Sequence, residues 1–227
     1  MEDAVTYGSG GKRKPKGPIK FQIVLTEEQK LAKAIILEST ITVLKGSAGS
    51  GKSMVAAQVA LDMLFRRDIQ RIVLTRPAVT SGEEIGFLPG DKDAKLAPYT
   101  AAVYDNMYRL YRKDIIDKHI QEGNIEVIPL AFMRGRNLSD CLVVVDEAQN
   151  ITHRQMELLL GRLCNGSKMI LCGDTAQIDL KDKKQSGFDF ITKHFTEIPG
   201  FSVVTLKANH RHNIVEPILK VYSEYRD

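Results

Sequence analysis

A glycine-rich segment, GSAGSGKS, runs from Gly46 to Ser53 and has the residue types needed to hold phosphate. It matches the pattern Gly, any four residues, Gly-Lys and then Ser or Thr. Glycines allow positive φ angles and let backbone N–H groups approach phosphate oxygens closely. We expect Lys52 to neutralise charge on the β- and γ-phosphates and the Ser53 hydroxyl to ligate Mg²⁺. The predicted nucleotide-binding residues here are Gly46, Ser47, Ala48, Gly49, Ser50, Gly51, Lys52 and Ser53.

A second chemical cluster, Asp146-Glu147, follows the most apolar run of the chain, Cys141–Val145. Unpaired carboxylates at the edge of a core cost several kcal/mol by rough estimate, and Mg²⁺ would relieve that cost. We therefore predict that Asp146 holds Mg²⁺ and that Glu147 is the general base that polarises the attacking water. The dipole of a following helix would also favour two acids here, but it does not explain their occurrence with a phosphate-binding loop.

A third polar cluster, Gly173-Asp174-Thr-Ala-Gln177, follows the apolar run Lys168–Cys172. In open α/β sheets, ligands bind beyond the carboxyl ends of the strands. We expect Gln177 to sense the γ-phosphate or to place the attacking water.

These clusters need a sheet to bring them together, and the pattern of the chain predicts one. Strand-like and helical segments alternate, which indicates an α/β domain with a parallel sheet, right-handed crossovers and helices on both faces. A helix rich in Ala, Leu and Met, without Gly or Pro, follows the phosphate-binding loop and directs its N-terminal dipole at the same anion. The predicted strands are 40–44, 72–75, 125–128, 141–145, 168–172 and 202–206, and the predicted helices include 54–65, 98–113, 153–164 and 214–225.

The 227 residues suit one folded domain, which we place at 21–227. Residues 1–20 are rich in glycine and lysine and are predicted to be a disordered basic tail. Its cations would either contact a nucleic acid backbone or remain solvated, and both interpretations stay open.

Composition sets broad limits on the class of protein. The net charge of +4 permits nucleic acid binding without requiring it. No signal peptide or long apolar run is evident, so we expect a cytoplasmic protein with no membrane partner. The chain has three cysteines, an odd number, and no two of them have the spacing of metal ligands. We therefore predict reduced thiols in the core.

Several other residues have both a structural and a functional interpretation. Thr26-Glu-Glu-Gln29 has the form of a capping box, which gives Gln29 a structural role at a helix start. Two segments are candidate nucleic acid contacts, the long loop 76–91 and the Arg134-Gly-Arg136 turn, although the turn would also suit an exposed surface. The tyrosines at 104, 108 and 111 are expected in the core or an interface rather than stacked on bases.

Together these motifs resemble the RecA-like core of superfamily 1 helicases, and more closely the PhoH family of ATPases. The resemblance covers roughly residues 24–225. The stretches that carry it are Arg76-Pro-Ala-Val79, Gly86-Phe-Leu-Pro-Gly-Asp91, Met133-Arg-Gly-Arg136, Asp146-Glu-Ala-Gln-Asn150, Gly166-Ser-Lys-Met169 and Gly173-Asp-x-x-Gln-Ile-Asp179.

The resemblance implies ATP and Mg²⁺ as cofactors, a single RecA-like P-loop domain, ATP hydrolysis, and roles in RNA metabolism and phosphate stress. It makes Gln29 the adenine-contacting glutamine. One departure lies near the C-terminus, where the family tends to have Val-Arg-His and this chain has Asn209-His210-Arg211-His212. Some members carry a PIN ribonuclease domain, which we do not expect in a chain of this length. Its compact length resembles phage-encoded members, which would place it in a host cytoplasm.

Phosphoryl transfer also needs a cation to stabilise its transition state, and an arginine finger can be worth roughly a thousandfold in rate. With one phosphate site and one sheet, we expect the arginine to come from a neighbouring subunit of a homo-oligomeric ring, with a hexamer favoured. The candidates are Arg211, Arg136 and Arg162.

Three functions fit these residues. The first is an ATPase that couples hydrolysis to binding or unwinding of RNA or single-stranded nucleic acid. The second is a nucleotide-dependent switch that acts on protein partners without nucleic acid. The third, a small-molecule kinase, is disfavoured because Glu147 beside Asp146 suits activation of water.

Overall fold

The computed structural model describes residues 18–77 and 104–225, so most of the loop 76–91 and most of the basic tail fall outside the described residues. Six parallel strands form one sheet in the order β3-β2-β4-β5-β1-β6. This confirms the predicted α/β architecture with a parallel sheet. The strands are β1 (Ile41–Gly46), β2 (Arg71–Thr75), β3 (Ile125–Val127), β4 (Cys141–Val145), β5 (Lys168–Gly173) and β6 (Phe201–Leu206).

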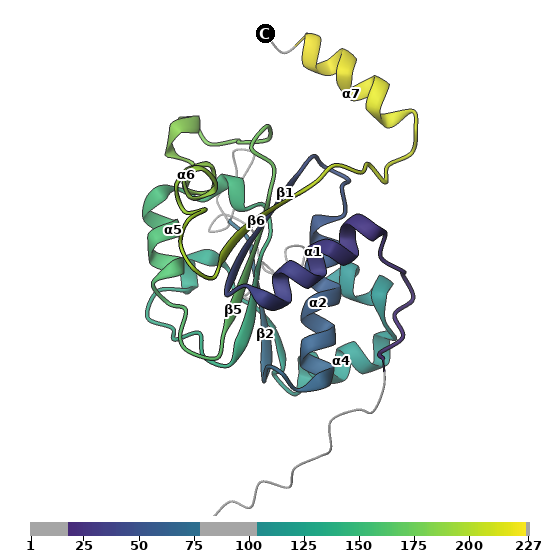
Figure 1. Cartoon of the computed structure of the whole chain (residues 1–227), viewed down its shortest axis with the longest axis vertical. Coiled ribbons are helices and arrows are strands. Elements are labelled where there is room, and N and C mark those ends of the chain that lie inside the picture. The colour runs from purple at the N-terminus through teal and green to yellow at the C-terminus, as the bar shows by residue number, and fades with distance from the viewer. Residues whose placement is uncertain (1–17, 78–103, 226–227) are drawn as a thin grey trace, which may run out of the picture.

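Helices cover both faces of this sheet (Figure 1). On one face lie α1 (Glu27–Glu38), α2 (Lys52–Arg66), α4 (Lys113–Gln121) and a helical stretch at 104–110. On the other lie α5 (His153–Leu160) and α6 (Gly187–His194). Short 3-10 turns occupy Leu130–Phe132, Ala148–Asn150 and Lys183–Gln185.

The alternation of β1 side chains divides the interior into two cores. Successive residues of a strand point to opposite faces. Leu44 accordingly packs in the core beneath α1 and α2, whereas Val43 packs in the core beneath α5 and α6. Every residue of β4 is buried, as expected for a central parallel strand covered on both sides.

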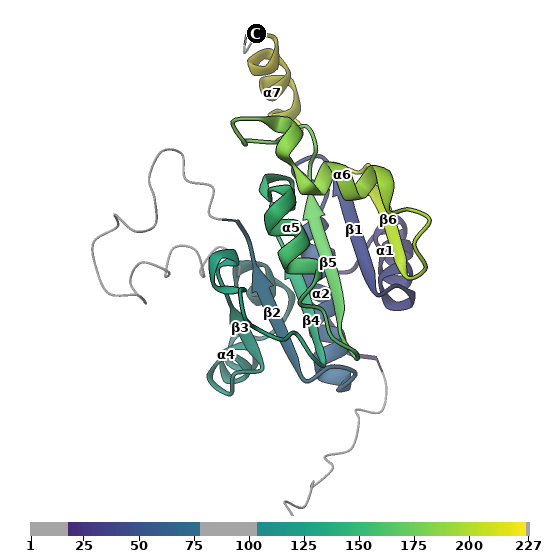
Figure 2. The same cartoon turned by 90° about the vertical axis from the view of Figure 1, so that its left-hand side faces the viewer.

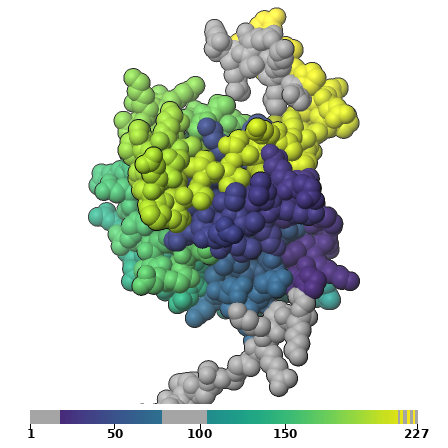
Figure 3. Space-filling view, in the orientation of Figure 1, coloured from purple at the N-terminus to yellow at the C-terminus, as the bar shows by residue number. Residues whose placement is uncertain are grey.

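The last helix, α7 (Val215–Glu224), stands apart from the body of the molecule (Figures 2 and 3). Pro217 is its third residue, so it falls in the first turn, where its missing N–H costs little. Among the described residues, no helix combines the length and the apolar character needed to cross a membrane.

Two predicted helix limits were wrong. The helix expected to continue to Cys164 ends at Leu160, because the following residues pair with another segment of the chain. The N–H of Leu138 donates to the carbonyl of Arg162, and the N–H of Cys164 donates to the carbonyl of Leu138. In the segment predicted as one helix to 113, a new helix, α4, begins after Arg112.

The three tyrosines pack against the core, and two of the three cysteines lie within it. Tyr104, Tyr108 and Tyr111 are partly buried against the core under α2, as predicted. Cys141 and Cys172 are buried thiols, and Cys164 is half-buried.

Candidate nucleotide-binding site

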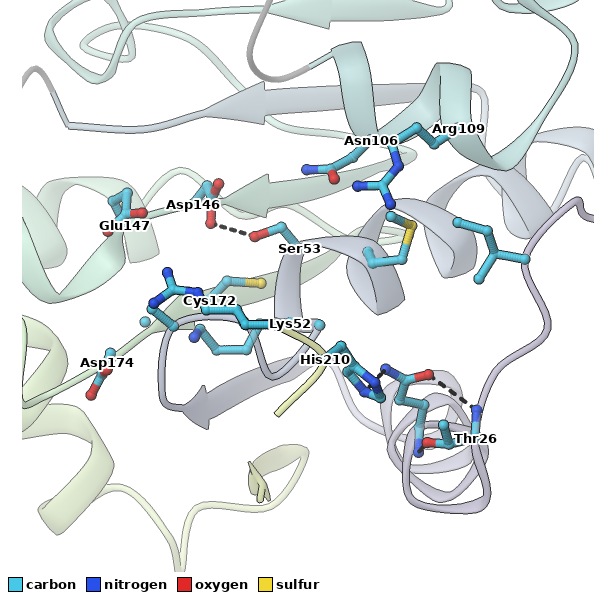
Figure 4. A pocket seen from close by; sticks show the side chains of 18 of the residues that line it. Thr26, Lys52, Ser53, Asn106, Arg109, Asp146, Glu147, Cys172, Asp174 and His210 are labelled. Carbon is cyan, nitrogen blue, oxygen red and sulfur yellow. Dashed lines mark hydrogen bonds between the residues drawn. The ribbon is translucent and has the colours of Figure 1, made fainter. Parts of the chain in front are cut away.

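A cavity of about 540 Å³ lies at the carboxyl ends of β1, β4 and β5, where the three polar clusters meet (Figure 4). Parallel strands end at a common edge of the sheet, which explains how such distant segments converge. The predicted site residues that line the cavity are Gln29, Ala48, Gly49, Gly51, Lys52, Ser53, Asp146, Glu147, Gln177 and Arg211. The remaining three, Gly46, Ser47 and Ser50, complete the loop behind them.

The backbone of the phosphate-binding loop needs its glycines. Gly49 and Gly51 both have a φ of 87°, in the left-handed region that favours glycine. A Cβ atom on Gly46 would lie 2.5 Å from the carbonyl oxygen of Leu206, so the end of β6 leaves no room for a side chain there. α2 begins directly after Gly51, and its N-terminus therefore faces the cavity.

Lys52 lies folded against this loop. Its Nζ donates hydrogen bonds to the carbonyl oxygens of Gly46 at 2.7 Å and Ser47 at 2.9 Å. The ammonium charge is thereby held at the centre of the loop, where phosphate oxygens would replace these carbonyls as partners.

Ser53 and Asp146 meet at the base of the cavity. The Ser53 hydroxyl donates to Oδ1 of Asp146 at 2.8 Å, and the two side chains point toward each other (Figure 4). A hydroxyl and a carboxylate side by side are oxygen ligands of the kind that Mg²⁺ prefers. The residues present therefore fit the predicted metal.

Glu147 is held at the edge of the cavity in an unusual backbone conformation. Its φ of 52° lies in the left-handed region, which a residue with a side chain occupies only at a cost. The amide of Gln149 donates to Glu147 Oε2 at 2.7 Å and to the carbonyl oxygen of Gln177 at 3.2 Å. Gln149 also accepts from the N–H of Asp174 at 3.2 Å.

Gln149 thus connects the second and third polar clusters, although it was not among the site residues predicted from sequence. The signal was present, since Gln149 belongs to the Asp146–Asn150 stretch, but a glutamine in a turn has no distinctive spacing. The side chain of Gln177 donates to Oδ2 of Asp174 at 2.9 Å, so it lies beside the cavity as expected while its role stays a prediction.

The segment after β6 forms another wall of the cavity, with His210 and Arg211 among the lining residues. The backbone N–H groups of Lys207 and Ala208 donate to the Glu28 carboxylate at 2.8 and 3.2 Å. The Lys207 N–H is the main cause of a lowered pKa at Glu28. The N–H of His210 donates to the carbonyl oxygen of Gly49 at 3.0 Å.

Arg211 is brought into the cavity by this segment of its own chain. A Cβ on Gly49 would lie 2.6 Å from Cγ of Arg211, so the arginine stem rests on the phosphate-binding loop. The other two candidates for an arginine finger do not line the cavity: Arg136 pairs with Glu126 at 3.2 Å, and Arg162 follows α5. The expected contribution from a neighbouring subunit stays a prediction.

Three further lining residues were not predicted as site residues. His210 comes from the segment after β6, and Asn106 and Arg109 come from the helical stretch at 104–110. His210 adjoins the predicted Arg211 in sequence, but no spacing marks it as a site residue. Asn106 and Arg109 lie far from the three motifs in sequence, so only the fold identifies these two. Cys172, near the end of β5, also lines the cavity. Burial raises the pKa of its thiol well above the usual range, and the charge of Asp146 adds a smaller effect in the same direction.

Known proteins resemble this chain over most of its length. The family model described as PhoH-like protein matches residues 23–223. A PhoH-like protein of Bacillus subtilis is 42% identical over 79% of this chain and 57% of its own length. One from Synechocystis is 40% identical over 82% of this chain and 58% of its own length. The chain therefore spans about half the length of the curated relatives it matches.

Solved structures show a similar fold at low sequence identity. The large terminase of a thermophilic bacteriophage superposes with a TM-score of 0.51 and 9% identity, over 87% of this chain and 50% of that one. The Pif1 helicase of Candida albicans superposes with a TM-score of 0.47 and 16% identity, over 90% of this chain and 44% of that one. The match of the family model to nearly the whole chain, with relatives at about 40% identity, shows that this chain belongs to the PhoH-like protein family.

Proposed function

We propose that this protein binds ATP with Mg²⁺ and hydrolyses it, and that hydrolysis is coupled to RNA or single-stranded nucleic acid. The observation that carries the proposal is the contact between Ser53 and Asp146 beside a phosphate-binding loop, with Glu147 adjacent. A bound Mg²⁺, held by Ser53 and Asp146, would neutralise charge on the β- and γ-phosphates.

The chain's own residues then have distinct tasks. Lys52 exchanges its loop carbonyls for phosphate oxygens. Glu147, oriented by Gln149, accepts a proton from the attacking water. Gln177 helps to place that water or senses the γ-phosphate, and Arg211 supplies positive charge to the transition state; both residues line the cavity.

Coupling to nucleic acid has weaker support. Arg134 and Arg136 lie in an exposed turn, but one guanidinium group already pairs with Glu126. The chain is mildly basic, with a formal net charge of +4. A homo-oligomeric ring remains part of the proposal as the arrangement in which a neighbouring subunit would supply the arginine.

ATP turnover with and without single-stranded RNA tests the proposal, on the wild type and on Glu147→Gln. We expect RNA to stimulate turnover, and we expect Glu147→Gln to abolish it while ATP still binds. Glu38→Gln, an exposed carboxylate at the end of α1, is the matched control and should behave as the wild type.

Each outcome decides between the candidates. Turnover that needs Glu147 but ignores RNA would refute the coupling and favour the nucleotide switch that acts on protein partners. Turnover that survives in Glu147→Gln would refute the assignment of the general base.

A further inference from the structure

A chain of hydrogen bonds connects the start of α1 to the segment after β6. Oε1 of Gln29 accepts from the backbone N–H of Thr26 at 3.1 Å. Nε2 of Gln29 lies 3.2 Å from Nε2 of His210, across 181 residues of sequence. Figure 4 shows His210 and Thr26 together at the end of the cavity opposite Asp146.

The protonation of His210 follows from this chain. A backbone N–H only donates, so the oxygen of the Gln29 amide must face Thr26 and its NH₂ group must face His210. The amide nitrogen is a donor, so Nε2 of His210 must accept. His210 is therefore neutral here and carries its proton on Nδ1, because an imidazolium would set one N–H against another.

Gln29 lies where a nucleobase would sit once the phosphates occupy the loop. Ile23, Val24 and Met54 also line the cavity and supply apolar surface for a flat ring. Gln29 is only 6% exposed, so its amide has little freedom. After its bonds to Thr26 and His210, the amide keeps one N–H donor and one oxygen lone pair.

This pattern of one donor beside one acceptor discriminates between purines. A 6-amino purine offers the acceptor N7 beside an amino donor and complements the amide. A 6-oxo purine sets its O6 acceptor against Oε1 of Gln29. A flipped or mobile amide would lose this preference.

We propose that His210 is a positioning residue that fixes the Gln29 amide and thereby selects adenine over guanine nucleotides. The inference rests on the proposed ATP binding. The backbone of His210 is anchored independently, by the carbonyl of Gly49 and by the Glu28 contacts just before it, so removal of the imidazole leaves the segment in place.

The test measures the dissociation constants of ATP and GTP for the wild type and each variant. Each nucleotide competes with a fluorescent ATP analogue. We expect His210→Ala to reduce the ratio of GTP to ATP dissociation constants by about fivefold or more, the effect of one lost hydrogen bond. His210→Gln places an oxygen acceptor near the position of Nε2 and should retain the ratio. His212→Ala is the control, since that ring contacts only the nearby Ile214 N–H among the described bonds.

The tautomer of the His210 ring gives a readout that a purely structural role would not. Nitrogen NMR of the nucleotide-free protein should show the Nδ1–H tautomer at His210.

The outcomes separate the two proposals. If the wild type binds neither nucleotide, the proposed function fails and this inference fails with it. If ATP binds but His210→Ala, with an unchanged melting temperature, retains the wild-type ratio, the inference alone is overturned. An Nε2–H tautomer at His210 would overturn it as well.

Discussion

The hydroxyl of Ser53 lies 2.8 Å from Oδ1 of Asp146, although 93 residues separate them in sequence. One belongs to the start of α2 and the other follows β4, so the contact joins the phosphate-binding loop to the second polar cluster. For the proposed Mg²⁺ site, this contact presets two oxygen ligands, which would reduce the ordering that metal binding requires.

Asp146→Asn should weaken ATP binding at least about tenfold in the presence of Mg²⁺, because it removes a charged metal ligand. In the presence of a chelator, the variant and the wild type should bind ATP equally. Fluorescence titration measures both affinities, with Asp105→Asn on the exposed side of the 104–110 helix as control. Equal loss with and without Mg²⁺ would contradict the assignment of Asp146 as a metal ligand.

Arg211→Ala should lower kcat by about a hundredfold or more, since it removes a cation from the transition state. Mixing this variant with Glu147→Gln identifies the subunit that supplies the arginine. Because the Arg211 stem rests on its own Gly49, we expect the mixture to stay inactive. Recovery of turnover would instead show that arginine crosses between subunits, as the sequence led us to expect.

Glu147→Gly should be more stable than Glu147→Ala by about 1 kcal/mol in free energy of unfolding. Both variants lose the bond from Gln149, but only glycine adopts the φ of 52° without a Cβ penalty. Urea denaturation of the two inactive variants measures the difference. Equal stabilities would mean that the backbone at this position relaxes when the side chain is removed.

Gly173→Ala should destabilise the protein by about 1–3 kcal/mol, because its Cβ would lie 2.7 Å from the buried ring of Phe188. The double variant Gly173→Ala/Phe188→Leu should lose less than the sum of the two single losses, since leucine vacates the clashing space. Urea denaturation of the three variants gives the coupling energy. Strict additivity would show that the two residues do not compete for this space.

At pH about 8 a thiol reagent should label Cys164 in the native protein long before the other two cysteines. Burial raises the pKa of the Cys141 and Cys172 thiols, whereas Cys164 is half-buried. Mass spectrometry after timed labelling identifies the modified residues. Rapid native labelling of Cys172 would contradict its placement under the cavity.

The raised pKa of Cys172 also predicts a pH dependence of stability. The folded state keeps this proton more tightly than the unfolded state does, so the unfolded state loses protons first as the pH rises. Stability should therefore fall once the pH exceeds about 9, near the pKa of a thiol in the unfolded chain, and Cys172→Ala should reduce that slope. Denaturant midpoints measured from pH about 9 upward test this, and an identical slope in the variant would contradict it.

Much of this fold was predictable because its signals are local. The run of apolar β-branched residues before Gly46 and the helix formers after Ser53 each specify one element, and Thr26 and Gln29 form the predicted capping box. The end of α5 at Leu160 was not predictable from the sequence. The helix ends because the residues that follow it pair with Leu138, and not because their helix propensity is low.

By itself, the sequence determined the phosphate-binding loop, the acidic pair after β4 and a parallel sheet, because each depends on residue types at fixed spacing. The tertiary structure alone decided which distant side chains join them. β6 pairs with β1 in a register that sets Leu206 beside Gly46, so the residues after each strand emerge side by side. For that reason Arg211 lies on its own phosphate-binding loop and His210 meets Gln29, contacts that depend on strand neighbours rather than on spacing along the chain.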